Sequence, residues 1–265
     1  MIRLYNQNIL GNIPKEAKVA NRNSLIADMI AEYRPDFCSF QECNPKTSRV
    51  GDTNMAALIA EQYAEACGDH AHENFTPVFY LKERFRQLDG GFLLYEGLND
   101  GRSKSITWAL FYDKREDRRL AVVSTHFWWK HRGDEDNEQR EENARALGRL
   151  CREIFEKYDV PIIVSGDLNS GYVSEQGPRG YEMMLKEGFV DVRGIAEEST
   201  DSHTIHSYPK LSEAGVYTPG GKPYGTIDYV FTYGKDISVT KFAVLADDRA
   251  RTSSDHCPLV VDFDL

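Results

Sequence analysis

The sequence has few cysteines, and their spacing follows no familiar pattern. Its five cysteines are Cys38, Cys43, Cys67, Cys151 and Cys257. The number is odd, there is no CxxC pair, and no set of ligands has the spacing of a zinc site. This argues against a disulfide framework and favours reduced thiols in a cytoplasmic protein.

Long apolar runs are also missing. No stretch approaches the roughly 20 apolar residues that span a bilayer, so we expect no membrane insertion. The first residues, MIRLYN, enter a strand-like pattern without a basic stretch and an apolar core, so we expect no secretory signal peptide. Internal repeats, low-complexity tracts and linker-like segments are absent, which predicts a single domain over residues 1–265.

The chain lacks an excess of positive charge. Lysine and arginine number 32 against 42 aspartates and glutamates, giving a formal net charge of −10. Such a chain has no overall positive field to attract long nucleic acids non-specifically. A local basic patch, or a divalent cation in an acidic cleft, would still allow a negatively charged ligand to bind.

Apolar periodicity predicts strands and helices interspersed along the chain. Strands are expected at 2–9, 36–41, 76–81, 85–94, 105–113, 119–126, 161–165, 203–208, 226–232, 236–245 and 258–264. Helices are expected at 18–33, 54–67, 138–158 and 180–187. Residues 209–224, with three prolines and three glycines, are expected to form a long surface loop. The mixture predicts a layered α/β domain.

The stretch VSGDLNS, residues 164–170, places Asp167 and Asn169 directly after an apolar strand. Turn chemistry alone explains these residue types, because tight turns prefer Gly, Asp, Asn and Ser. Polar residues recur, however, at other apolar segments: Asn8, Glu42, His126, Asp228, Asp255 and His256. Each taken singly also fits a structural role. A buried carboxylate or imidazole costs several kcal/mol unless it is paired or binds a metal, so the recurrence predicts one shared site.

The order of these residues resembles the endonuclease/exonuclease/phosphatase superfamily. The resemblance is carried by Asn8, Gln41-Glu42, Ser124-Thr125-His126, Gly166-Asp167-Leu168-Asn169, Ile227-Asp228-Tyr229 and Ser254-Asp255-His256. Residues 76–85 (TPVFYLKERF) and 107–111 (TWALF) resemble a bacterial branch whose substrates are mostly unassigned. The resemblance implies a four-layer αββα sandwich of the DNase I type, with the active site where strand ends converge.

The resemblance also implies roles for these residues. Glu42 would be the principal metal ligand, supported by Asn8 and Asp255. Because Glu42 and Asn8 offer only oxygen ligands, the set favours Mg²⁺ or Mn²⁺ over zinc. Asp167 and Asn169 would orient water and phosphate. His256 would act as general base or phosphate contact with its tautomer held by Asp228, and His126 would donate to a phosphoryl oxygen or the leaving group.

Two points stay open at this level. In nuclease-like relatives, the histidine matching His126 often pairs with a glutamate; here that region reads Glu73-Asn74-Phe75. The aromatic pair Trp128-Trp129 suits either the core or a rim that stacks on a base, sugar or lipid head group. The leading prediction is a metal-dependent phosphoesterase acting on a phosphorylated small molecule or a phosphodiester. The alternatives are a DNA or RNA nuclease, and a non-catalytic descendant that binds a phosphorylated ligand.

Overall fold

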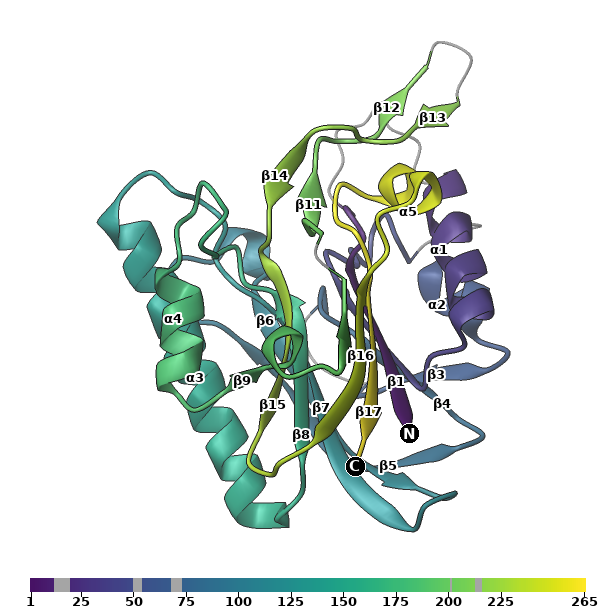
Figure 1. Cartoon of the computed structure of the whole chain (residues 1–265), viewed down its shortest axis with the longest axis vertical. Helices are drawn as coiled ribbons and strands as arrows, with labels where there is room; N and C mark the ends of the chain where they lie inside the picture. The colour runs from purple at the N-terminus through teal and green to yellow at the C-terminus, as the bar shows by residue number, and fades with distance from the viewer. Residues whose placement is uncertain (12–19, 50–53, 68–72, 201, 213–215) are drawn as a thin grey trace.

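Two β-sheets packed face to face form the centre of the protein, and helices cover both outer surfaces (Figure 1). The computed structural model describes residues 1–11, 20–49, 54–67, 73–200, 202–212 and 216–265. This arrangement confirms the predicted four-layer αββα sandwich. None of the helices in these described residues is long and apolar enough to cross a membrane.

The first sheet has seven strands and contains both ends of the chain. Its order is β10 (Glu198–Ser199), β16 (Ser238–Val244), β17 (Leu259–Asp264), β1 (Ile2–Asn8), β2 (Phe37–Gln41), β4 (Val78–Leu81) and β3 (Tyr63–Glu65). β1 runs parallel to β2 and antiparallel to β17, so the sheet is mixed. Because β1 is central and covered on both faces, its predicted alternation gives a strand whose residues are nearly all buried.

The second sheet has six strands. Its order is β5 (Phe85–Leu94), β6 (Ser105–Asp113), β7 (Arg118–His126), β8 (Ile162–Asp167), β15 (Asp228–Tyr233) and β9 (Val190–Asp191). β7 and β8 are parallel, whereas β15 pairs antiparallel with β8. The apolar run Ile162–Val164 is buried on both faces, which explains why it shows no alternation in the sequence.

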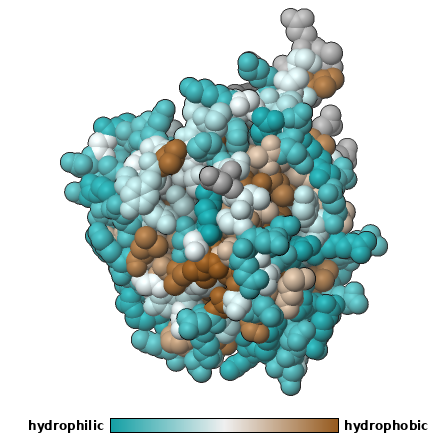
Figure 2. All heavy atoms as spheres, in the orientation of Figure 1, coloured by the Kyte–Doolittle hydropathy of each residue, from teal (hydrophilic) through white to brown (hydrophobic). Residues whose placement is uncertain are grey.

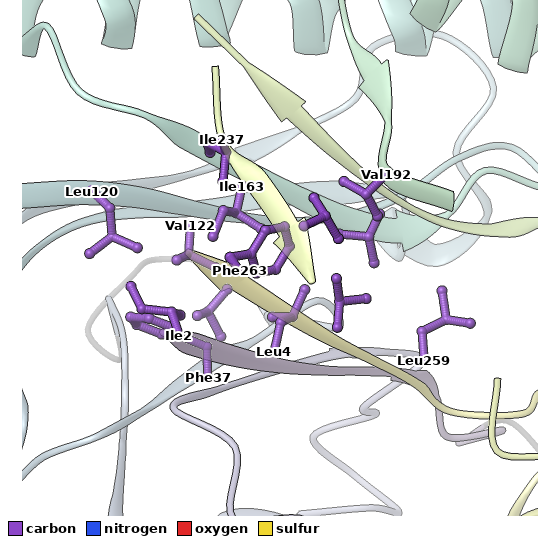
Figure 3. Packing of buried hydrophobic residues seen from close by; sticks show 14 of the residues in the cluster. Ile2, Leu4, Phe37, Leu120, Val122, Ile163, Val192, Ile237, Leu259 and Phe263 are labelled. Atoms are coloured by element: carbon purple, nitrogen blue, oxygen red, sulfur yellow. The ribbon is translucent and has the colours of Figure 1, made fainter. Parts of the chain in front are cut away.

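Three apolar clusters hold the layers together. The cluster between the sheets includes Ile2, Phe37, Val122, Ile163 and Phe263, all fully buried (Figure 3). Complete burial of each such side chain contributes about 1.5–3 kcal/mol. A second cluster packs the six-stranded sheet against α3 (Asp134–Tyr158) and α4 (Arg179–Lys186). A third packs the seven-stranded sheet against α1 (Ala20–Tyr33) and α2 (Met55–Ile59).

An arm extends from one end of the sandwich (Figure 1). Its root is β11 (Ile205–His206) paired with β14 (Pro223–Gly225), and its outer part is β12 (Lys210–Leu211) paired with β13 (Tyr217–Thr218). The face shown in Figure 2 is mostly hydrophilic, and its hydrophobic side chains gather mainly near the middle. The arm shares its end of the sandwich with the short helix α5 (Asp248–Ser253).

The structure corrects two predicted segments. The helix expected at 54–67 is limited to α2, and Tyr63–Glu65 instead forms β3, because Tyr63 pairs with Leu81 and its hydroxyl donates to the carbonyl of Pro35. The loop expected at 209–224 contains β12 and β13, whose backbone groups pair with one another. Residues 18, 19 and 213–215 of the expected segments lie outside the described residues.

Candidate active site

Strand direction brings the polar residues of the sequence to one end of the sandwich. The parallel strands β1 and β2 finish there at Asn8 and Gln41, and the parallel strands β7 and β8 finish there at His126 and Asp167. β15 runs the other way, so its first residue, Asp228, lies opposite Asp167. Antiparallel β17 likewise begins just after the sequence Ser254-Asp255-His256. The C-terminal ends of β1, β2, β7 and β8 and the N-terminal ends of β15 and β17 therefore lie at the same end of the sandwich.

Local backbone conformation determines how the side chains of Asp167, Asn169 and Glu42 are oriented. A Cβ atom on Gly166 would lie 2.1 Å from the carbonyl oxygen of Thr125, so glycine allows β8 to approach β7 just before Asp167. Asn169 has φ of 46°, a left-handed conformation that asparagine tolerates. Glu42 has φ of 53°, which is unfavourable for glutamate. Strain of this kind is concentrated at functional sites.

Asn8 connects the two sheets at the site. Its Nδ2 donates to Oδ2 of Asp167 at 3.0 Å and to Oε1 of Glu42 at 3.3 Å. Its Oδ1 accepts from the backbone nitrogen of Leu10 at 3.0 Å. The side-chain nitrogen of Asn8 thus faces the carboxylates, and rotation of the amide would be needed before Oδ1 could ligate a cation beside Glu42.

The imidazole of His126 lies within a group of polar side chains. Its Nε2 is 3.1 Å from Nδ2 of Asn169 and 3.4 Å from Oδ2 of Asp167. Lys104 Nζ lies 2.7 Å from the same Nε2 atom. Burial, followed by the charges of Lys104 and His256, lowers the pKa of His126 well below its usual value. His126 is therefore neutral near pH 7.

Neither Glu73 nor Asn74 is the partner of His126. The side chain of Asn74 accepts hydrogen bonds from Thr76 and Thr107, and Glu73 forms an exposed ion pair with Lys46 at 3.3 Å. His126 therefore does not form the histidine–glutamate pair of nuclease-like relatives. It contacts Lys104, Asn169 and Asp167 instead.

His256 occupies the other side of the site. Its Nδ1 lies 2.9 Å from Oδ2 of Asp228, and its Nε2 lies 3.9 Å from Oδ2 of Asp167 and 4.0 Å from Oδ1 of Asp255. Burial alone lowers the pKa of His256, but Asp228, Asp255 and Asp167 outweigh it and raise that pKa well above the usual value. The ring is therefore protonated at neutral pH, in contrast to His126.

Two buried carboxyl groups, those of Asp167 and Asp255, have pKa values raised above the usual value for aspartate. Burial and the nearby charge of Asp228 raise the pKa of Asp167 to about 7. Burial and the charge of Glu42 raise the pKa of Asp255 to about 6. Both shifts arise because negative charge accumulates in a site from which water is largely excluded.

The charges of the site do not balance within the protein. Its carboxylates are Glu42, Asp167, Asp228 and Asp255, and its basic groups are Lys104 and His256. A divalent cation would compensate the remaining negative charge. Asp167, Asp228 and His256 each offer a ligand atom within 4.8 Å of the others, so this buried group could hold a metal ion. All eight residues predicted from the sequence lie in one contiguous set of contacts with this group.

Lys104 is not among the residues that the sequence predicts for the site. It lies in the stretch NDGRSK, which has the composition of an exposed turn, yet its side chain is almost entirely buried. Burial lowers the pKa of Lys104 to about 8, while the charges of Glu42, Asp167 and Asp100 oppose that shift. The signal that could have identified it is its position immediately before β6, next to the strand that ends at His126.

The two tryptophans after His126 have different environments. Trp128 is buried, and its Nε1 donates to Oδ1 of Asp136 at 2.6 Å, so it belongs to the core. Trp129 is 46% exposed, and its Nε1 donates to Oδ2 of Asp100 at 3.0 Å. Nζ of Lys130 lies 5.4 Å from the ring centroid of Trp129. Only Trp129 therefore suits a rim beside the site.

The fold and the strand-end site define the class of this protein: an αββα sandwich of the DNase I type with a buried carboxylate–imidazole centre. The chain matches the Endonuclease/Exonuclease/phosphatase family over residues 6–256, and it belongs to that family. Members of the family are phosphoesterase hydrolases. No curated protein sequence matches the chain.

Solved structures with the same fold share little sequence with this chain. A mannosyl-6-phosphatase from Bacteroides thetaiotaomicron has a TM-score of 0.78 at 18% identity, covering 100% of both chains. A family protein from Bacteroides vulgatus has a TM-score of 0.74 at 22% identity, covering 100% of this chain and 98% of the other. The catalytic domain of human Nocturnin, with a bound sulfate anion, has a TM-score of 0.70 at 21% identity, covering 99% and 93%.

Proposed function

We propose that this protein is a divalent-metal-dependent phosphoesterase whose substrates are compact phosphate esters. The observation that carries the proposal is the contiguous set of carboxylate, amide and imidazole groups at the strand ends, in which the negative charge exceeds the positive charge. Hydrolysis of a phosphate ester needs the negative charge of the phosphoryl group to be neutralised, a positioned water, and a proton donor or acceptor.

The residues of the chain fit Mg²⁺ or Mn²⁺. Glu42, Asn8 and Asp255 offer oxygen ligands, which these hard cations prefer. The raised pKa values of Asp167 and Asp255 support a cation site, because a nearby cation would favour their ionised forms. When bound, such an ion would supply Lewis-acid stabilisation to the phosphoryl oxygens. Glu42, Asn8 and Asp255 would hold it once the Asn8 amide has rotated, because His256, in the group with Asp167 and Asp228, is protonated and offers no lone pair to a cation.

The remaining residues would contact the phosphoryl oxygens, the attacking water and the leaving group. Protonated His256, oriented by Asp228 through Nδ1, would contact a phosphoryl oxygen through Nε2. Asn169 and Asp167, fixed by the bond from the Asn169 nitrogen to Oδ1 of Asp167 at 2.8 Å, would position water and phosphate. Neutral His126 lies on the opposite side, where it would interact with a phosphoryl oxygen or the leaving group.

Two observations support compact substrates. The net charge of −10 disfavours non-specific binding of long nucleic acids. The similar structure from Bacteroides thetaiotaomicron is described as a mannosyl-6-phosphatase, which places sugar phosphates first among the compounds to be tested. The test is a panel of sugar phosphates, nucleotides, phospholipids and nucleic acids assayed with Mg²⁺, with Mn²⁺ and with excess EDTA. Full activity in EDTA contradicts the metal dependence.

A nuclease is the second candidate, and Trp129 is the observation that favours it. An exposed aromatic ring with a lysine over its face can stack on a nucleic-acid base. Tight and steeply salt-dependent binding of random duplex DNA would support this candidate over compact esters. Binding of phosphate esters without hydrolysis would instead point to the non-catalytic role.

We also propose that the protein acts in the cytoplasm. All five cysteines are free thiols in the structure, and four of them are buried. Reduced thiols are typical of cytosolic proteins. Localisation of the full-length protein by cell fractionation tests this proposal.

A further inference from the structure

Lys104 has an unusual position for a lysine. It lies immediately before β6, at the end of the six-stranded sheet where β7 and β8 finish, and its side chain is only 4% exposed. Lysines are almost never buried to this extent unless the ammonium group is paired. The position therefore requires a partner for the charge.

The structure contains no carboxylate partner for that charge within the described residues. Nζ of Lys104 lies 2.7 Å from Nε2 and 3.2 Å from Nδ1 of His126, and these are its polar contacts in that part of the chain. Glu42, Asp167 and Asp100 influence it only through longer-range charge. A neutral imidazole does not compensate an ammonium charge, and a buried ammonium group without a charged group in direct contact keeps part of its desolvation cost.

The backbone of Lys104 is nevertheless held firmly. The side chain of Asn99 accepts from the nitrogen of Lys104 at 2.9 Å and donates to its carbonyl oxygen at 2.8 Å. The backbone nitrogen of Tyr95 donates to the same carbonyl at 3.1 Å. A charge that is fixed in place before a ligand arrives needs no reorganisation when negative charge develops. A buried ammonium group on a fixed backbone is the arrangement expected of a residue that binds an anionic ligand.

We propose that Lys104 is a catalytic residue that binds a non-bridging phosphoryl oxygen of the substrate, beside His126 and Asn169. The phosphoryl group would provide a negative partner in direct contact with Nζ, which no carboxylate of the described residues does. His126 would share this side of the site, while His256 and Asp228 would serve the opposite side. The inference rests on the proposed phosphoesterase function, and it adds a residue outside the set predicted from the sequence.

The test compares Lys104→Met, which keeps the length but removes the charge, with Lys104→Arg, which keeps the charge. The matched control is Lys114→Met, because Lys114 is exposed at the far end of β6 and its Nζ, among the residues that the structure describes, donates to the carbonyl of Lys82. Two quantities are measured with Mg²⁺ present: the affinity for inorganic phosphate by calorimetry, and kcat/KM on the best substrate of the panel. Thermal unfolding establishes that each variant is folded, and Lys104→Gln replaces Lys104→Met if that variant does not fold.

We expect Lys104→Met to weaken phosphate binding at least about tenfold and to lower kcat/KM by roughly 10²–10³-fold, with partial retention in Lys104→Arg. Lys114→Met should match the wild type. If the wild type hydrolyses its substrate and the folded Lys104→Met or Lys104→Gln variant is within threefold of it in both measurements, the inference is wrong and the phosphoesterase proposal stands. If the wild type hydrolyses nothing but its phosphate binding depends on Lys104, the phosphoesterase proposal fails and the anion contact stands. A wild type that binds no phosphate overturns the inference.

Discussion

The imidazole of His256 is held by the carboxylate of Asp228, with Nδ1 3.0 Å from Oδ1 and 2.9 Å from Oδ2. The two residues are 28 positions apart in the sequence. Asp228 begins a strand of the six-stranded sheet, and His256 precedes a strand of the seven-stranded sheet. The contact therefore exists only when the two sheets are packed, and it links the fold directly to the orientation of the ring.

Asp228→Asn should keep much of the substrate affinity while lowering kcat by roughly 10²–10⁴-fold, because the amide neither supports the protonated ring nor fixes its Nδ1 proton. His256→Ala should lower kcat by at least as large a factor. The double variant should be little worse than His256→Ala alone, since the pair acts as one unit. Steady-state kinetics on the three variants measure this. Losses that multiply would show independent action, and a lowered melting temperature with unchanged activity would show a purely structural role for Asp228.

Glu42→Gln should reduce metal-dependent hydrolysis by at least about 10²-fold, because an amide is a poorer ligand for Mg²⁺ than a carboxylate. Glu42→Ala should abolish it, and both variants should stay folded, because Glu42 is not part of the apolar core. Assays across a Mg²⁺ titration, with circular dichroism, measure both effects.

Glu73→Gln is the matched control for Glu42, because it removes one exposed carboxylate whose ion pair within the described part of the chain is with Lys46. Its activity should equal that of the wild type. Loss of activity in this variant would contradict the assignment of Lys104, Asn169 and Asp167, instead of Glu73, as the groups around His126.

In the metal-free protein, the contribution of Asp167 to stability should be lost as the pH rises toward neutrality. The pKa of Asp167 is about 7 in the folded protein and about 3.9 in an unfolded chain, so the folded state binds more protons between these values. Its contribution to the free energy of unfolding is present below about pH 4 and is lost as the pH rises through about 7. Asp255, with a pKa of about 6, acts in the same direction.

Asp167→Asn mimics the protonated carboxyl and tests this dependence. In EDTA, the variant should unfold at a higher temperature than the wild type near pH 8, and the difference should shrink toward about pH 5. Added Mg²⁺ should stabilise the wild type more near pH 8 than near pH 5, because ionised carboxylates bind the cation. Thermal melts over this range measure both. An Asp167→Asn variant that is less stable than the wild type at pH 8 would argue against the raised pKa.

Trp128 and Trp129 should respond differently to substitution. Trp128→Phe should lower the free energy of unfolding by about 1–3 kcal/mol, because it leaves the buried Asp136 carboxylate without its indole donor. Trp129→Ala should change stability by less than about 1 kcal/mol but raise KM if the exposed ring contacts the leaving group. Urea unfolding and steady-state kinetics separate the two effects. An unchanged KM for every hydrolysed substrate would exclude Trp129 from the rim.

Local sequence determined most of the strands and the residue types at their ends. Alternation over 2–9 and the apolar run at 161–165 predict β1 and β8 because side-chain direction and burial follow directly from local periodicity. The ordered polar residues, from Asn8 to His256, likewise indicate one shared site, since buried polar groups need partners.

Tertiary structure decided the features that depend on which segments lie side by side. Tyr63 joins a strand instead of extending a helix because β4 lies beside it. His126 contacts Lys104 instead of Glu73 because antiparallel β6 and β7 place the start of one strand beside the end of the other. A lysine in a turn-like stretch carries no local sign of burial. The burial of Lys104 results from contacts between residues distant in sequence. Periodicity and turn propensity depend only on residues that are close along the chain, so they do not predict it.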